Sequence, residues 1–188
     1  MRQNISIKRT NRVVLLINLL INLITFTGYL VEVLRGERTL SYLLIFSAII
    51  FVPFIIALVV YRKNPTSTSF KFITLIGYLF FYLYVSFTSI HIITFIYFFC
   101  IILMYYLYLD FKLLLVSCIT ALIINIARIG YNIFVLGLNS ERNITEYMIQ
   151  MGTLIVFSLS ITLSTKLSIL FNKESMENIL MEKSLMKS

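Results

Sequence analysis

Residues 70–111 read FKFITLIGYLFFYLYVSFTSIHIITFIYFFCIILMYYLYLDF, and this stretch decides the fold. Its charged residues are Lys71 near one end and Asp110 near the other. As one helix rising 1.5 Å per residue, the stretch would be about 60 Å long, which is twice the hydrocarbon thickness of a bilayer. We therefore predict two membrane-spanning helices, joined by a turn at residues 88–91 (Thr-Ser-Ile-His).

The composition of the whole chain agrees with a membrane protein. The chain has 188 residues, of which 60% are hydrophobic and 13% are charged, whereas a soluble domain has about a quarter charged residues. Four more apolar segments are each long enough to cross a bilayer, namely residues 13–34, 40–61, 113–138 and 147–171. The sequence therefore predicts an all-α, polytopic bundle of six transmembrane helices over residues 13–171. Proline removes a backbone donor, so we expect Pro53 to kink the second helix.

The positions of Lys and Arg predict the orientation of the bundle. If the N-terminus is cytoplasmic, twelve of the sixteen basic residues lie on the cytoplasmic side and three lie outside, as the positive-inside rule requires. We therefore expect a multi-pass protein of the cell membrane with both termini in the cytoplasm, where residues 1–12 form a basic tail. Because the basic residues flank apolar segments, the net charge of +8 reflects topology and does not indicate nucleic-acid binding.

One polar face stands out inside the predicted fifth helix. Its members are spaced three or four residues apart and therefore share one side of a helix, namely Cys118, Ala121, Asn125, Arg128 and Asn132. An arginine at bilayer depth needs a partner or a wet cavity, so this face should point into the bundle. Glu32, at the outer end of the first helix, and Glu146, at the outer start of the sixth, are the candidate partners of Arg128.

Two interpretations of Arg128 remain open. It forms a structural ion pair and extends toward the outer interface, or it belongs to a ligand-binding pocket for a small anion. In the second interpretation Arg128, Asn125, Asn132, Glu32 and Glu146 form the site. A similar stripe on the first helix, Asn18, Asn22, Thr25 and Tyr29, is typical of hydrogen bonding between membrane helices.

The sequence offers little for catalysis. His91 and Cys100 are nine residues apart on one predicted helix, about 13 Å along its axis, whereas a thiol nucleophile needs its base within hydrogen-bonding reach. We find no metal-binding or phosphate-binding motif, and Cys100 and Cys118 lack the spacing of a metal or disulfide pair. We expect a protein that is not an enzyme, has no catalytic or metal-binding residues and needs no cofactor.

The last segment, residues 172–188, changes character without a Gly or a Pro. Its apolar residues recur at spacings of about three, four and seven, as on a coiled-coil seam. These residues are Met176, Ile179, the pair at 180 and 181, and Met186. We predict that the sixth helix continues into the cytoplasm as the possible start of a coiled coil, through which two copies pair. A solvated basic tail is the alternative.

Three segments carry a resemblance to a known family. They are GYLVEVLRGERTLSYLLIF at 28–46, ARIGYNIFVLGL at 127–138 and LSTKLSILFNKE at 163–174. These segments resemble the multi-span N-terminal sensor region of bacterial methyl-accepting chemotaxis proteins and related signal transducers. The resemblance implies a membrane sensor domain that acts on downstream signalling proteins. No residue here matches the methylated glutamates or the kinase-coupling tip of that family.

The alternative function is a component of a small-molecule importer, because substrate-binding membrane subunits of energy-coupling-factor transporters have a similar length and number of spans. Those subunits dock through an Ala-x-x-x-Ala face on the first helix. Asn18 and Asn22 occupy that spacing in this chain, so the sensor is the favoured interpretation.

Overall fold

The computed structural model describes residues 2–89 and 92–186 of the chain, and this part is entirely helical. Its helices are α1 (Arg2–Leu34), α2 (Leu40–Lys63), α3 (Ser69–Thr88), the short 3-10 helix η1 (Ile92–Phe95), α4 (Ile96–Tyr106), α5 (Phe111–Phe134) and α6 (Glu141–Leu185). The predicted all-α class is therefore confirmed. His91, at the predicted turn, lies outside the described residues.

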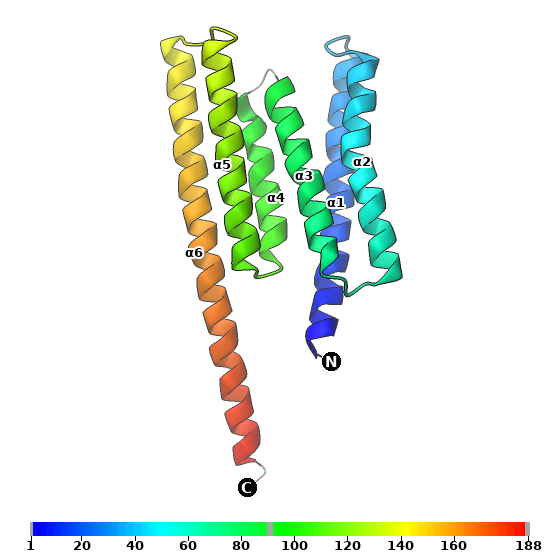
Figure 1. Ribbon diagram of the computed structural model, residues 1–188, viewed down its shortest axis with the longest axis vertical. Helices are drawn as coiled ribbons and strands as arrows, with labels where there is room; N and C mark the ends of the chain where they lie inside the picture. Colours follow the sequence, from blue (N-terminus) through cyan, green and yellow to red (C-terminus); the bar gives the residue numbers. More distant parts are fainter. Residues whose placement is uncertain (1, 90–91, 187–188) are drawn as a thin grey trace.

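The helices form one elongated bundle, in which α3 and α4 lie between the α1–α2 pair and the α5–α6 pair (Figure 1). The largest helix–helix contacts are α2 with α3, α1 with α2, and α5 with α6, whereas α1 makes only a small contact with α4. Helix α1 begins and α6 ends at the same end of the bundle (Figure 1). We call this the termini end, and the other the opposite end.

Local sequence explains where several helices begin and end. Thr39 accepts a hydrogen bond from the backbone of Tyr42 and caps α2, and Asp110 accepts one from the backbone of Leu113 and caps α5. These side chains satisfy backbone donors that a helix start leaves unpaired. Gly36 and Gly137 have φ values of 76° and 66°, and this left-handed conformation, which glycine adopts without strain, ends α1 and α5.

Five of the described helices are long and apolar enough to cross a membrane. Helix α4 has only 11 residues, because 3-10 geometry replaces its first turn in η1 and the chain leaves the helix after Tyr106. Leu109 has a left-handed φ of 48° in the turn that follows α4. Residues 70–111 therefore form one long helix and one short one, not two of similar length.

Much of the surface is apolar, as expected for helices that contact lipid. Large side chains such as Ile24, Ile55, Phe80 and Leu163 are more than half exposed away from the ends of the long helices. The sides that face the bundle contain the buried core, which includes Phe46, Phe81 and Leu154.

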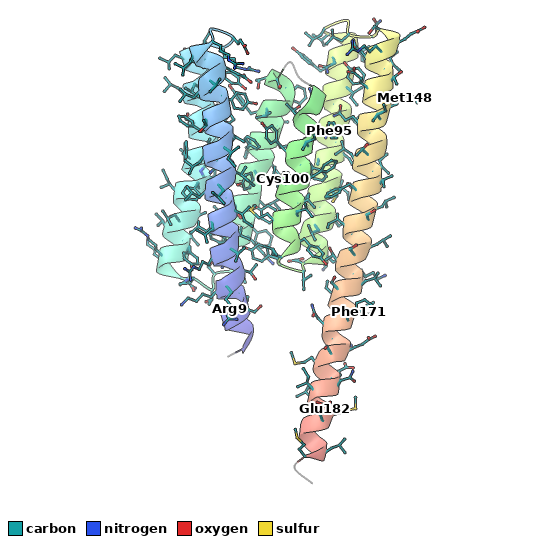
Figure 2. All side chains as sticks on the ribbon, turned by 180° about the vertical axis from the view of Figure 1, so that it is seen from behind. Arg9, Phe95, Cys100, Met148, Phe171 and Glu182 are labelled. Carbon is teal, nitrogen blue, oxygen red and sulfur yellow. The ribbon has the colours of Figure 1, made fainter. Side chains whose placement is uncertain are left out.

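Helix α6 is much longer than its neighbours. It runs without a break from Glu141 to Leu185, and its last part extends well beyond the other helices (Figure 1). Phe171 and Glu182 both lie on this extension, whereas Met148 lies near the opposite end (Figure 2).

Helices α2 and α3 approach closely at one point. A Cβ atom placed on Gly77 of α3 would lie 2.4 Å from the Cβ atom of Pro53 in α2. No side chain larger than hydrogen fits at this contact without a shift of the helices. Gly77 is therefore what allows α3 to pack against α2 where Pro53 interrupts the hydrogen bonds of that helix.

Candidate ligand-binding site

The polar face of α5 points into the bundle, as its spacing predicts. Four members of this face are buried, namely Cys118, Ala121, Asn125 and Arg128. Arg128 is only 3% exposed. Asn132, the fifth member of the predicted face, is half-buried, and its backbone oxygen accepts a hydrogen bond from the Leu138 N–H. The interior of the bundle thus holds a strongly polar layer.

Asn125 joins three helices in this layer. Its Nδ2 atom donates to the hydroxyl of Tyr82 in α3 at 2.6 Å and to the Ala121 backbone oxygen at 2.7 Å. Its Oδ1 atom accepts a hydrogen bond from Nε2 of Gln150 in α6 at 2.5 Å. Gln150 and Tyr82 are each only 1% exposed, so these bonds form away from both water and lipid.

Arg128 lies one helical turn beyond Asn125 on the same face. Its Nη1 atom donates to Oγ1 of Thr94 in η1 at 2.7 Å. Tyr82 and Tyr147 lie within electrostatic range of the guanidinium group. The polar layer therefore contacts η1 through Arg128 and α6 through Asn125.

Glu32 and Glu146 make their ion pairs with other arginines. Oε2 of Glu32 lies 2.6 Å from Nε of Arg38, and Oε1 of Glu146 lies 3.1 Å from Nε of Arg142. Arg38 also packs over the ring of Tyr42, 4.1 Å from its centroid. The structure therefore brings Asn125 and Arg128 together, and it places the two glutamates in separate ion pairs, of which the Glu32–Arg38 pair is partly buried and the Glu146–Arg142 pair is exposed.

A cleft near Arg128 is the candidate site. It has a volume of about 430 Å³ and lies between α1 on one side and Ser89, η1 and the start of α4 on the other. Its walls include Glu32, Tyr29, Tyr97 and Thr94. This volume and the mixture of aromatic and polar groups are typical of small-molecule sites. Of the predicted site residues, Glu32 lines the cleft, and Arg128 lies directly behind Thr94.

Two hydrogen bonds and one turn of α5 connect the cleft to α6. The path runs from Thr94 in the cleft wall to Arg128, along one turn of α5 to Asn125, and then to Gln150. Sequence spacing revealed the α5 part of this path. Thr94 was missed, because it lies in an apolar segment whose break from α-helical geometry is not visible in the sequence.

The polar stripe on α1 holds the first three helices together. Asn18, Asn22, Thr25 and Tyr29 are all buried, which confirms that they share an inward face. Nδ2 of Asn22 donates to Oδ1 of Asn18 at 3.1 Å and to the backbone oxygen of Ile50 in α2 at 3.2 Å. This stripe serves packing between helices, and its upper part, Thr25 and Tyr29, also lines the cleft.

The described residues contain no group of three His, Cys, Asp or Glu side chains that could hold a metal ion. Cys100 is exposed and lies midway along α4, as Figure 2 shows, and Cys118 is buried in α5. No protein-family model, curated protein or solved structure matches this chain.

Proposed function

We propose that the chain is a sensory domain of the cell membrane, with both termini in the cytoplasm, in which occupancy of the cleft is relayed to α6. The observation that carries this proposal is a pair of hydrogen bonds, Arg128 with Thr94 and Gln150 with Asn125, whose α5 residues lie one helical turn apart. A ligand that displaces Thr94 must also disturb Arg128, because a buried guanidinium is costly without its hydrogen bonds. The continuous helix α6 then carries the displacement to the termini end.

In this proposal the bundle has six membrane segments. The 3-10 helix η1 and α4, with four and 11 residues, together rise about 24 Å. They are flanked by longer helices, and Thr94 of η1 is buried, so the irregular turn can lie at bilayer depth against protein. The ligand is proposed to be a small anion, with Arg128 as the nearest buried positive charge.

The experiment uses a covalent occupant of the cleft. Gly28 lines the cleft and has no atom within 4 Å of a Cβ position, so a Gly28→Cys variant accepts a thiol-reactive benzyl methanethiosulfonate. The background lacks Cys100 and Cys118. Thr27→Cys is the matched control, because Thr27 is the adjacent residue of α1, is exposed and is not part of the cleft lining.

Hydrogen–deuterium exchange of α6 is the readout in a detergent-solubilised or nanodisc preparation. Modification at Gly28→Cys should change exchange in peptides from 141–185, whereas modification at Thr27→Cys should not. Arg128→Leu or the milder Thr94→Val should abolish the change without preventing membrane insertion. An unchanged α6, or a change that persists in both relay variants, would show that the cleft and α6 are not coupled.

The output surface in this proposal is the extension of α6. The face that α6 presents to the bundle includes the buried Leu154, Ile161 and Thr165, and steps of three or four residues continue this face to Met176 and Ile179. Copies in one membrane insert with the same orientation, so their extensions are parallel and can pair along this seam before acting on downstream signalling proteins. Disulfide formation between copies at Ile179→Cys but not at Asn178→Cys would support pairing.

A further inference from the structure

A second cleft, at the termini end, is not used by the proposed relay. It has a volume of about 580 Å³ and lies among the start of α1, the α2–α3 turn and the α4–α5 turn. Its polar lining consists of Ser6, Asn11, Ser67, Thr68, Lys71, Tyr108, Asp110 and Lys112. Three separate parts of the chain thus meet around a polar space.

Asn11 fixes the geometry of this cleft. It is 1% exposed, and its Nδ2 atom donates to the backbone oxygens of Pro65 at 2.9 Å and Ser67 at 3.2 Å. Its Oδ1 atom accepts a hydrogen bond from the Tyr108 hydroxyl at 2.8 Å. The two turns are therefore held against α1 by one buried side chain, and the cleft is formed before any ligand binds.

The cleft carries net positive charge. Nζ of Lys71 lies 2.6 Å from Oδ2 of Asp110, so these two charges balance, and the exposed Lys112 adds one positive charge. The exposed Arg9 and Arg12 lie on the same first turns of α1. Hydroxyl groups of Ser67 and Thr68 complete a lining that can donate hydrogen bonds to an anion.

The position of the cleft favours a lipid over a dissolved anion. Helices α3 and α5 begin at Ser69 and Phe111, so the cleft lies where their apolar segments meet the membrane–water boundary. One turn further along, Phe72 is 50% exposed and Val116 is 58% exposed. A bound headgroup would therefore have apolar side chains directly beneath it for its acyl chains.

We propose that this cleft binds the phosphate of an anionic phospholipid headgroup, with Lys112 and Lys71 as the charged contacts. Basic pockets between membrane helices on the cytoplasmic side bind such headgroups. The site rests on the proposed function only for the cytoplasmic placement of the termini end, and it is independent of the relay at the opposite end.

The test places one fluorophore in the cleft. The chain contains no tryptophan, so Phe111→Trp, at a residue that lines the cleft, makes Trp emission specific to this site. The protein is reconstituted into phosphatidylcholine vesicles in which a varied fraction is replaced by brominated phosphatidylglycerol, which quenches the emission on contact. Brominated phosphatidylcholine gives the reference for lipids without net charge.

We expect phosphatidylglycerol to be preferred over phosphatidylcholine by about five-fold, the preference that one lysine near the membrane surface provides. Lys112→Gln should remove most of this preference, and Lys112→Arg should keep it. Lys166→Gln is the matched control, because Lys166 is an exposed lysine of α6 outside the cleft, and it should leave the preference unchanged. Because Lys112 is exposed, its replacement should not prevent folding.

Three results would overturn the proposal. Equal quenching by the two lipids would mean that no anionic headgroup binds. An equal loss of preference in Lys112→Gln and Lys166→Gln would mean that the lipid responds to overall charge and not to this cleft. Displacement of the brominated phosphatidylglycerol by inorganic phosphate at about 50 mM, but not by sodium chloride at the same ionic strength, would identify a site for the free ion instead, because both salts screen surface charge equally.

Discussion

The bond between Asn125 and Gln150 should be measurable as a coupling energy between α5 and α6. The two changes are Asn125→Leu and Gln150→Leu, which preserve side-chain size closely while removing the amides. Gln150→Leu removes the donor from Asn125 Oδ1, and Asn125→Leu removes that bond together with the one to the Tyr82 hydroxyl. Both sites are at most 1% exposed, so neither lipid nor water can replace the lost partner.

The geometry sets the expected magnitudes. Gln150→Leu leaves one buried acceptor with no donor and should cost about 1–2 kcal/mol. Asn125→Leu leaves the Gln150 amide and the Tyr82 hydroxyl without this partner and should cost about 2–4 kcal/mol. In the double variant the Gln150 amide is absent as well, so the two costs should not add. We expect a coupling energy of about 0.6 kcal/mol, the average for hydrogen bonds between membrane helices, and no more than about 1.7 kcal/mol, the largest such value.

The assay is reversible unfolding of the bundle by SDS in mixed micelles, followed by circular dichroism for the wild type, both single variants and the double variant. Thr153→Val serves as the control, because Thr153 lies on the exposed face of α6 and bonds only to its own helix. Its change should stay within about 0.5 kcal/mol. Additive costs, with a coupling energy below about 0.3 kcal/mol, would refute a hydrogen bond between α5 and α6 at this position.

Further predictions concern the turns and the closest contact between helices. Gly77→Ala should destabilise the bundle by about 1–3 kcal/mol in the same assay, since the new Cβ would meet Pro53, whereas Gly152→Ala, which has open space, should be neutral or stabilising. Burial raises the pKa of Asp110, but hydrogen bonds from its lysine partner and the α5 backbone outweigh burial and hold the pKa below the ordinary value. The stability that Asp110 contributes is therefore present above its unfolded pKa and lost as the pH falls through its lower folded pKa. The melting temperature of the wild type should therefore fall more between pH 7 and about pH 3 than the melting temperature of Asp110→Asn. Asn11→Leu should cost about 1–3 kcal/mol, measured by SDS unfolding, and should weaken phosphatidylglycerol selectivity, because the two turns lose their common anchor.

The sequence was sufficient for the class of fold and for most inward faces, since both follow from periodicity. Apolar length predicts the long helices, and spacing of three and four places Asn18, Asn22, Asn125 and Arg128 inside. The unequal division of residues 70–111 into a long and a short helix does not follow from periodicity. The difference between an α-helix and the 3-10 turn of η1 is small in free energy, so packing against neighbouring helices decides it, and no residue in the run marks it as Gly or Pro would.

Partners across the bundle could not be predicted from spacing. Glu32 and Glu146 were chosen for Arg128 because they are acidic and lie at the right depth, but each has an arginine within six residues of itself in the sequence, and each pairs with that nearby residue. Local pairs need less ordering of the chain than distant ones, which favours them wherever both are available. Thr94 as a contact of Arg128 required knowledge of how η1 faces α5, which is set by tertiary packing.

Buried polar contacts hold α1 to α2 on one side of the cleft and α5 to α6 on the other. The α1 stripe binds α1 to α2 through Asn22 and Ile50, and Asn125 binds α5 to α6, while α1 contacts α4 only slightly. A ligand that enters between α1 and α4 therefore separates weakly packed surfaces and leaves the strongly bonded pairs intact. The Tyr82–Asn125 bond lies between the two sides. In the proposed relay, a small rotation about this bond would alter the Thr94–Arg128 contact and move α6 as a rigid unit.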